Sequence, residues 1–277
     1  MNSEMLKFAI DLLAVLLLAL GIKGLSKVRS ARSANRLAAI AMGLAVVGVL
    51  VDFLLGSDSS SSISADSWIW IVFGTSVGSF FGWFTAKRVP MTSMPETVAL
   101  FNGCGGMSSL LVALGVVIFQ SQNIGLAQTI SVVVSVFVGA ITFSGSIIAM
   151  AKLQGWLSTP GWMQSKMRHA FNIAFAVMTL VAAIYLLINQ SPVGVNAPLW
   201  LLVVGASLLG IGVTLPIGGA DMPVVISLLN SYSGVAAAAA GFVVGSQLLI
   251  VAGAMVGAAG LILTQVMCKG MNRSLVS

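Results

Sequence analysis

Nine apolar segments of about 20 residues each make up most of this 277-residue chain. A helix needs about 20 mostly apolar residues to cross the hydrocarbon core of a bilayer. Only 7% of the residues are charged, whereas a soluble domain has about 25%. The sequence therefore predicts an all-α integral membrane protein, built as a bundle of nine transmembrane helices. The predicted helices are about 5–24, 36–56, 67–86, 94–119, 126–151, 168–188, 197–215, 221–243 and 247–269.

Basic residues mark the predicted connections on one side of the membrane. They follow the first, third, fifth and ninth helices, as Lys23, Lys27, Arg29, Arg32, Arg36, Lys87, Arg88, Lys152, Lys166, Arg168, Lys269 and Arg273. The positive-inside rule then places the N-terminus outside and the C-terminus in the cytosol. The net charge of +6 is explained by these clusters, so we expect no nucleic-acid partner. We expect one transmembrane domain over 1–277.

The segment 218–241, GGADMPVVISLLNSYSGVAAAAAG, is the most distinctive part of the chain. Asp221 precedes Pro223 at the cytosolic end of a predicted helix, as a helix N-cap would. Alternatively, its carboxylate accepts protons at the mouth of a pathway, and the two roles can coexist. Asn230 lies about 13 Å deeper along the helix axis. Such a residue serves either as interhelical hydrogen-bonding glue or as part of an ion path.

The predicted helix 94–119 begins with a capping-box pattern, Ser93-Met-Pro-Glu96, which places Glu96 at the cytosolic end. Asn102 follows about 9 Å further in. The glycines at 103–106 follow no predicted strand, so a dinucleotide-binding loop is rejected. Ser146 lies in a polar stretch of the next helix. Its signal is weak by itself, because serine can bond to its own helix backbone.

Small residues recur at helical spacing in the last two predicted helices. Gly253, Gly257 and Gly260 are spaced four and three residues apart, and Gly234 precedes Gly241 by two turns. In lipid, such stripes let helix backbones approach closely. We expect close packing at these glycines, with a gating shift of one helix as the functional alternative.

The sequence contains no pattern typical of an active site. It has no nucleophile–base constellation, metal cluster or phosphate loop, and Cys104 and Cys268 lie in or at the end of apolar segments. We therefore expect no catalytic residue, no metal and no bound cofactor in this chain. Any enzymatic chemistry would take place in another domain.

Several stretches closely resemble the membrane part of the beta subunit of proton-translocating NAD(P) transhydrogenase. They are GGADMPVVISLLNSYSGVAAAAAGF (218–242), LLIVAGAMVGAAG (248–260), MCKGMNRS (267–274), MTSMPETVAL (91–100) and GAITFSGSIIAMAKL (139–153). The resemblance covers essentially the whole chain. It implies a dimeric bacterial inner-membrane enzyme that couples proton movement to hydride transfer between NADH and NADP⁺. It also implies that NAD(H) and NADP(H) bind soluble domains, and that the NADP(H)-binding domain follows residue 277.

The resemblance also implies roles for individual residues. It places Asn102, Ser146, Asp221 and Asn230 on the proton pathway and Gly260 at a gating position, and we expect Glu96 and Arg273 at the cytosolic mouth. Many family members have a mid-membrane histidine where this chain has Asn102. Asparagine does not titrate near neutral pH, whereas histidine does. The expected partners are therefore transmembrane helices of an alpha subunit, one of which supplies a histidine, together with the soluble domains, a second copy of the chain and the lipid bilayer.

Two other functions compete with this one. A small-solute secondary transporter would be supported by broken helices in matching halves, but the sequence shows no convincing repeat. A purely structural membrane scaffold would leave the polar centre of 221–243 unexplained.

Overall fold

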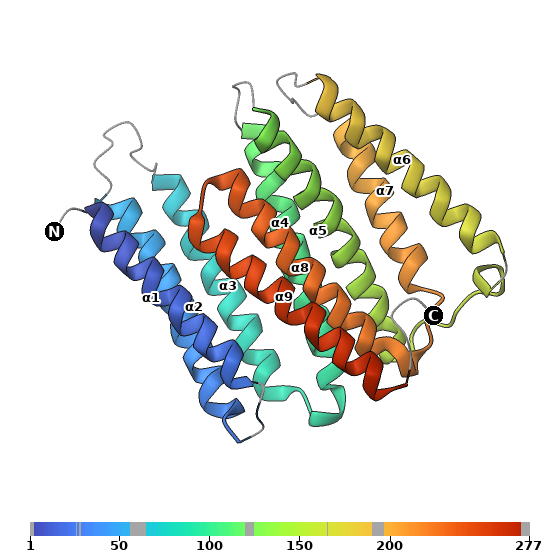
Figure 1. The fold of residues 1–277 in the computed structure, drawn as a ribbon, viewed down its shortest axis with the longest axis horizontal. Helices are drawn as coiled ribbons and strands as arrows, with labels where there is room; N and C mark the ends of the chain where they lie inside the picture. Colours follow the sequence, from blue (N-terminus) through green and yellow to red (C-terminus); the bar gives the residue numbers. More distant parts are fainter. Residues whose placement is uncertain are drawn as a thin grey trace. The chain divides into compact units, whose positions relative to one another are not determined.

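The computed structural model describes residues 3–25, 27, 29–55, 65–119, 125–164, 166–189 and 197–272. Within these ranges the chain forms nine long helices and three short 3₁₀ turns, with no strand (Figure 1). The long helices are α1 Ser3–Leu25, α2 Ala31–Leu55, α3 Ala65–Arg88, α4 Met94–Phe119, α5 Leu126–Leu153, α6 Met167–Asn189, α7 Ala197–Thr214, α8 Met222–Val244 and α9 Gln247–Gly270. The turns are η1 Met91–Ser93, η2 Gly161–Gln164 and η3 Gly219–Asp221.

The predicted all-α fold with nine membrane-spanning helices is confirmed for the described residues, since each long helix is apolar and long enough to cross a membrane. The largest difference lies at the start of α2, which begins at Ala31 instead of residue 36. The Ala34 amide already donates to the Ser30 carbonyl at 2.9 Å. Counting apolar residues misses this first turn because the turn contains a charged residue, Arg32. A helix can extend beyond the hydrocarbon core of the bilayer with such residues.

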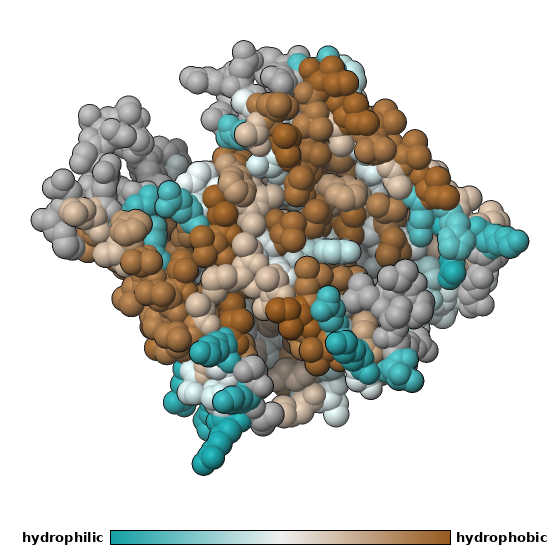
Figure 2. Space-filling model, in the orientation of Figure 1, coloured by the Kyte–Doolittle hydropathy of each residue, from teal (hydrophilic) through white to brown (hydrophobic). Residues whose placement is uncertain are grey.

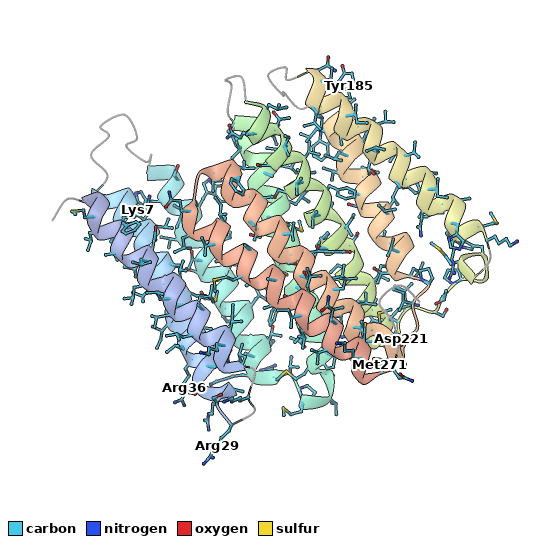
Figure 3. The ribbon with its side chains drawn as sticks, in the orientation of Figure 1. Lys7, Arg29, Arg36, Tyr185, Asp221 and Met271 are labelled. Atoms are coloured by element: carbon cyan, nitrogen blue, oxygen red, sulfur yellow. The ribbon has the colours of Figure 1, made fainter. Side chains whose placement is uncertain are left out.

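The chain divides into two compact units, Met1–Thr92 and Ser93–Ser277, and each is described by itself. In the first unit, α1 and α2 pack against each other through small residues. A Cβ added to Gly24 would lie 2.7 Å from the Ala34 Cβ, so only glycine permits this approach. Lys7 lies at one end of the pair, and Arg29 and Arg36 lie at the other (Figure 3).

The second unit is arranged around α5. This helix contacts α4, α7 and α8 extensively and α6 to a smaller extent, while α8 pairs with α9 and α6 pairs with α7. The core of the unit consists of small and branched apolar side chains, among them Ala113, Val136, Ala140, Leu202 and Ala206, all fully buried or nearly so. Small side chains at the centre of α5 allow helices on several sides of it to lie close.

The outer surface of the helices is apolar. On α6, Leu180, Val181 and Ile184 are 59%, 61% and 46% exposed. Figure 2 shows hydrophobic residues over the middle of the helices on the face in view, and hydrophilic residues gathered toward helix ends. This distribution suits a protein whose solvent at mid-height is lipid.

Candidate functional site at the junction of three helices

Asn102 joins three helices of the second unit. Its Nδ2 donates to the Ser146 Oγ at 2.9 Å, which links α4 to α5. The Ser233 Oγ on α8 donates to the Asn102 Oδ1 at 2.9 Å and lies 3.3 Å from the Asn102 carbonyl oxygen. Both ends of the amide are therefore paired, which fixes its orientation. We call Asn102, Ser146 and Ser233 the Asn102 junction.

Glycines beside Asn102 bring α4 and α5 close enough for a short serine side chain to reach it. A Cβ at Gly103 would lie 3.2 Å from the Ser146 Cβ. A Cβ at Gly106 would lie 2.9 Å from the Gly139 carbonyl oxygen and from the Thr142 Cβ. Gly103 and Gly106 therefore act in the packing of α4 against α5.

Two further hydroxyls lie on the face of α5 that carries Ser146. Ser135 and Thr142 precede Ser146 by 11 and 4 residues, which places all three on one side of the helix. The Ser135 Oγ lies 3.1 Å from the Ser109 carbonyl oxygen and 3.2 Å from the Ala236 carbonyl oxygen, so it also links α4, α5 and α8. The Thr142 Oγ1 is buried and has no hydrogen-bond partner among the described residues.

Asn230 is half-buried and lies three residues before Ser233, so the two share a face of α8. In the part of the chain that the structure describes, the Asn230 side chain forms no hydrogen bond, unlike Asn102. The structure thus brings together Asn102 and Ser146 of the predicted pathway and adds Ser233. It leaves the Asn230 amide available to water or to another chain.

Asp221 is half-buried and precedes the first residue of α8. It lies at the predicted N-cap position, with Pro223 in the first turn of α8, but its side chain accepts no capping hydrogen bond. The backbone explains this: Asp221 ends the 3₁₀ turn η3 with φ −91° and ψ −5°, whereas a capping residue is usually extended. Asp221 and Met271 lie at the same end of the second unit, and Tyr185 lies at the opposite end (Figure 3).

The four glycines predicted for close packing or gating are all buried where α8 meets α9. A Cβ at Gly260 would lie 2.9 Å from the Ser231 Cα and backbone nitrogen. A Cβ at Gly234 or Gly253 would meet the backbone of the facing helix more closely still, whereas the nearest atom to a Cβ at Gly257 would be 3.3 Å away. These positions bring the two backbones almost into contact.

Buried hydroxyls hydrogen-bond across this glycine contact. The Ser231 Oγ donates to the Gly257 carbonyl at 2.7 Å. The Thr264 Oγ1 lies 2.8 Å from the Gly260 carbonyl oxygen and 3.0 Å from the Ser227 Oγ. Sequence analysis missed Ser227 and Thr264, although Ser227 lies two turns before Gly234 and Thr264 lies one turn after Gly260, so helical spacing from the predicted contact could have found them.

Neither of the two residues predicted for the cytosolic mouth is a described member of the junction. Glu96 is half-buried in the first turn of α4, and Arg273 falls outside the described residues. No group of His, Cys, Asp and Glu that could hold a metal ion is present in the described part of the chain. The residues of the Asn102 junction can donate and accept hydrogen bonds, but none of them titrates near neutral pH.

The chain matches known proteins over nearly its whole length. A family model described as NAD(P) transhydrogenase beta subunit matches residues 7–277. Two relatives from Rhodospirillum rubrum, one of them from strain ATCC 11170, are named NAD(P) transhydrogenase subunit beta. Each is 39% identical to this chain over 277 residues, which is 98% of this chain and 56% of the relative. The chain thus spans about half the length of these curated relatives. A match of this extent confirms the resemblance noted in the sequence: the chain belongs to the family of NAD(P) transhydrogenase beta subunits.

Proposed function

We propose that this chain is the proton-conducting membrane part of an NAD(P) transhydrogenase. In this proposal, proton passage through the chain is coupled to hydride transfer between NADH and NADP⁺, which takes place in soluble domains outside residues 1–277. The observation that carries the proposal is the Asn102 junction, where side chains of three apolar helices meet in hydrogen bonds of 2.9 Å. Polar groups at membrane depth are costly, and they commonly mark ion paths.

The proposed path leads from Asp221 past Asn230 to the Asn102 junction. The Asp221 carboxylate is the titratable group and exchanges protons with the cytosolic side. Asn230 and the junction supply hydrogen bonds to water along the path. The half-buried position of Asn230, one turn from Ser233 on the same face of α8, supports this assignment.

A titratable group beside the Asn102 junction has to come from another chain in this proposal. The surface of α4 next to Asn102 has room for one: Cys104 and Gly105 are exposed, and Phe101 is 47% exposed. An exposed glycine permits close approach of a neighbouring helix. We therefore propose that an alpha-subunit transmembrane helix packs here and places a histidine near Asn102.

The wider setting follows from the same proposal. The helices would form one domain in the bacterial inner membrane, with the N-terminus outside and a second copy of the chain in a dimer. The glycines where α8 meets α9 would allow one helix to shift against the other. NADP(H) would bind a soluble domain that docks near Asp221 and near the predicted mouth residues Glu96 and Arg273.

The test uses the complete enzyme, with all its subunits and soluble domains, reconstituted in proteoliposomes. Asn230→Leu and Asp221→Leu are expected to abolish proton uptake and to slow NADPH-linked turnover. Asn189→Leu is the matched control, since Asn189 is exposed at the end of α6 and bonds only to the Tyr185 carbonyl among the described residues. Proton uptake and turnover near wild type in both pathway variants would show that the assignment is wrong.

A further inference from the structure

Lys152, in the last turn of α5, hydrogen-bonds to the segment that follows a different helix, α7. Its Nζ donates to the Thr159 Oγ1 at 2.7 Å, to the Ile217 carbonyl at 2.7 Å, and to the Leu215 carbonyl. An ammonium group has three N–H donors, so each of them is used. Lys152 is half-buried, and all three acceptors are uncharged.

The two carbonyls belong to the chain just after α7. That helix ends at Thr214, and Pro216 cannot continue it. The last carbonyls of a helix have no partner within the helix and carry partial negative charge. Lys152 bonds to two carbonyls of the residues that follow the helix, and this places its positive charge at the C-terminal end of α7, where that sign is favourable.

This segment leads directly to Asp221. Only Gly218, Gly219 and Ala220 separate the Ile217 carbonyl from it. A Cβ at either glycine would have no atom within 4 Å, so these two positions are not enclosed, whereas Ile217 before them and Met222 after them pack in an apolar cluster. Lys152 itself lies six residues after Ser146 on α5. It therefore connects the helix that carries part of the Asn102 junction to the segment that carries Asp221.

We propose that Lys152 is a positioning residue that holds segment 215–221 against the end of α5 and so sets the place of the Asp221 carboxylate. The role of Asp221 in proton exchange rests on the proposed function, whereas the part of Lys152 in holding the segment rests on the three hydrogen bonds. In the sequence, Lys152 contributed only to the predicted topology. Lys166 carries the same positive charge in the connection between α5 and α6, but it is exposed.

The experiment measures the rate at which a hydrophilic maleimide labels Leu215→Cys in the complete purified enzyme. Leu215 is buried, so a thiol there reacts only when segment 215–221 moves away from α5, and the parent enzyme without this substitution gives the background from Cys104 and Cys268. Lys152→Met keeps the aliphatic stem and removes every donor. We expect it to raise the labelling rate about tenfold or more, because even one hydrogen bond to a charged group contributes that factor to an opening equilibrium. Lys152→Arg is expected to restore a slow rate, and Lys166→Met to leave the rate unchanged.

A Lys152→Met rate within about twofold of the parent, less than one typical hydrogen bond would give, would overturn the proposal. So would an equal rise in Lys166→Met, which would indicate a general effect of surface charge. If Lys152→Met does not accumulate in the membrane, Thr159→Val decides. It removes one acceptor of Lys152 and the 3.2 Å hydrogen bond to the Leu215 carbonyl, and an unchanged labelling rate would contradict the proposal.

Proton uptake by the same Lys152 variants separates this inference from the proposed function. Faster labelling together with lower proton uptake supports both. Faster labelling with normal proton uptake supports the holding of segment 215–221 but contradicts its link to Asp221 in proton exchange. If Asp221→Leu keeps wild-type proton uptake while Lys152→Met still raises the labelling rate, only the proposed function is overturned.

Discussion

The Asn102 amide donates to the Ser146 hydroxyl at 2.9 Å, and this bond ties α4 to α5 inside the apolar part of the chain. Because Ser233 donates to the other end of the amide, the orientation of the group is defined. An asparagine amide has two N–H donors, and Ser146 occupies one of them. In the proposed function, the second donor binds a water molecule or a side chain of another subunit, and the proton path continues from Asn102 in this way.

A histidine of another subunit is expected near Asn102 in the assembled enzyme. Asparagine cannot hold a proton near neutral pH, so a proton path through this junction needs a titratable neighbour. A structure of the complete membrane complex should place an imidazole nitrogen within hydrogen-bonding distance of the Asn102 side chain, directly or through one water. Lipid chains or apolar side chains covering Asn102 would contradict the expectation.

Substitutions at Asp221 should distinguish proton exchange by its carboxylate from a structural role of the residue at the start of α8. Serine is a good capping residue but does not titrate near neutral pH. Asp221→Ser is therefore expected to lose proton uptake in the complete enzyme, whereas Asp221→Glu retains a measurable part of it. Recovery of full uptake in Asp221→Ser would mean that the carboxylate carries no protons.

Adding a methyl group where α8 meets α9 should destabilise the protein in proportion to the space available. A Cβ at Gly260 would lie 2.9 Å from backbone atoms of Ser231, so Gly260→Ala should lower the free energy of unfolding by about 1–3 kcal/mol. Gly257→Ala, with its nearest atom at 3.3 Å, should cost less. Gly270→Ala is the control, because a Cβ there meets no atom within 4 Å. Thermal unfolding in detergent measures the series, and equal stability of all three variants would refute close packing.

Much of the fold could be predicted from the sequence because the bilayer imposes a length on each apolar segment. The helices α4 to α9 begin and end close to their predicted positions. The start of α2 could not be found in this way, because Arg32 and Arg36 extend the helix beyond its apolar run. Nor does the apolar pattern show which helices are neighbours, since all of them must face either lipid or protein.

The candidate site was harder to predict. The family resemblance helped to identify Asn102, Ser146 and Asn230. Sequence spacing could not have done so, because Asn102 and Ser146 are 44 positions apart and such a spacing predicts no contact. Ser135 and Thr264 escaped notice because a hydroxyl in a helix can bond to its own backbone. Lys152 escaped because its charge was explained by topology. For Ser135 and Lys152 the missing information was the neighbouring helix, which only the folded chain supplies, whereas the spacing of Thr264 from Gly260 was a signal in the sequence.

Proton uptake by Asn102→Leu in the reconstituted complete enzyme tests the central claim most directly. Leucine fills a similar volume but loses the hydrogen bonds to Ser146 and Ser233. Ser135→Ala is the matched control, since it removes hydrogen bonds between the same three helices away from Asn102. A proton path through the Asn102 junction predicts that uptake in Asn102→Leu falls to the level of leakage while Ser135→Ala still pumps. Wild-type uptake in Asn102→Leu would contradict it.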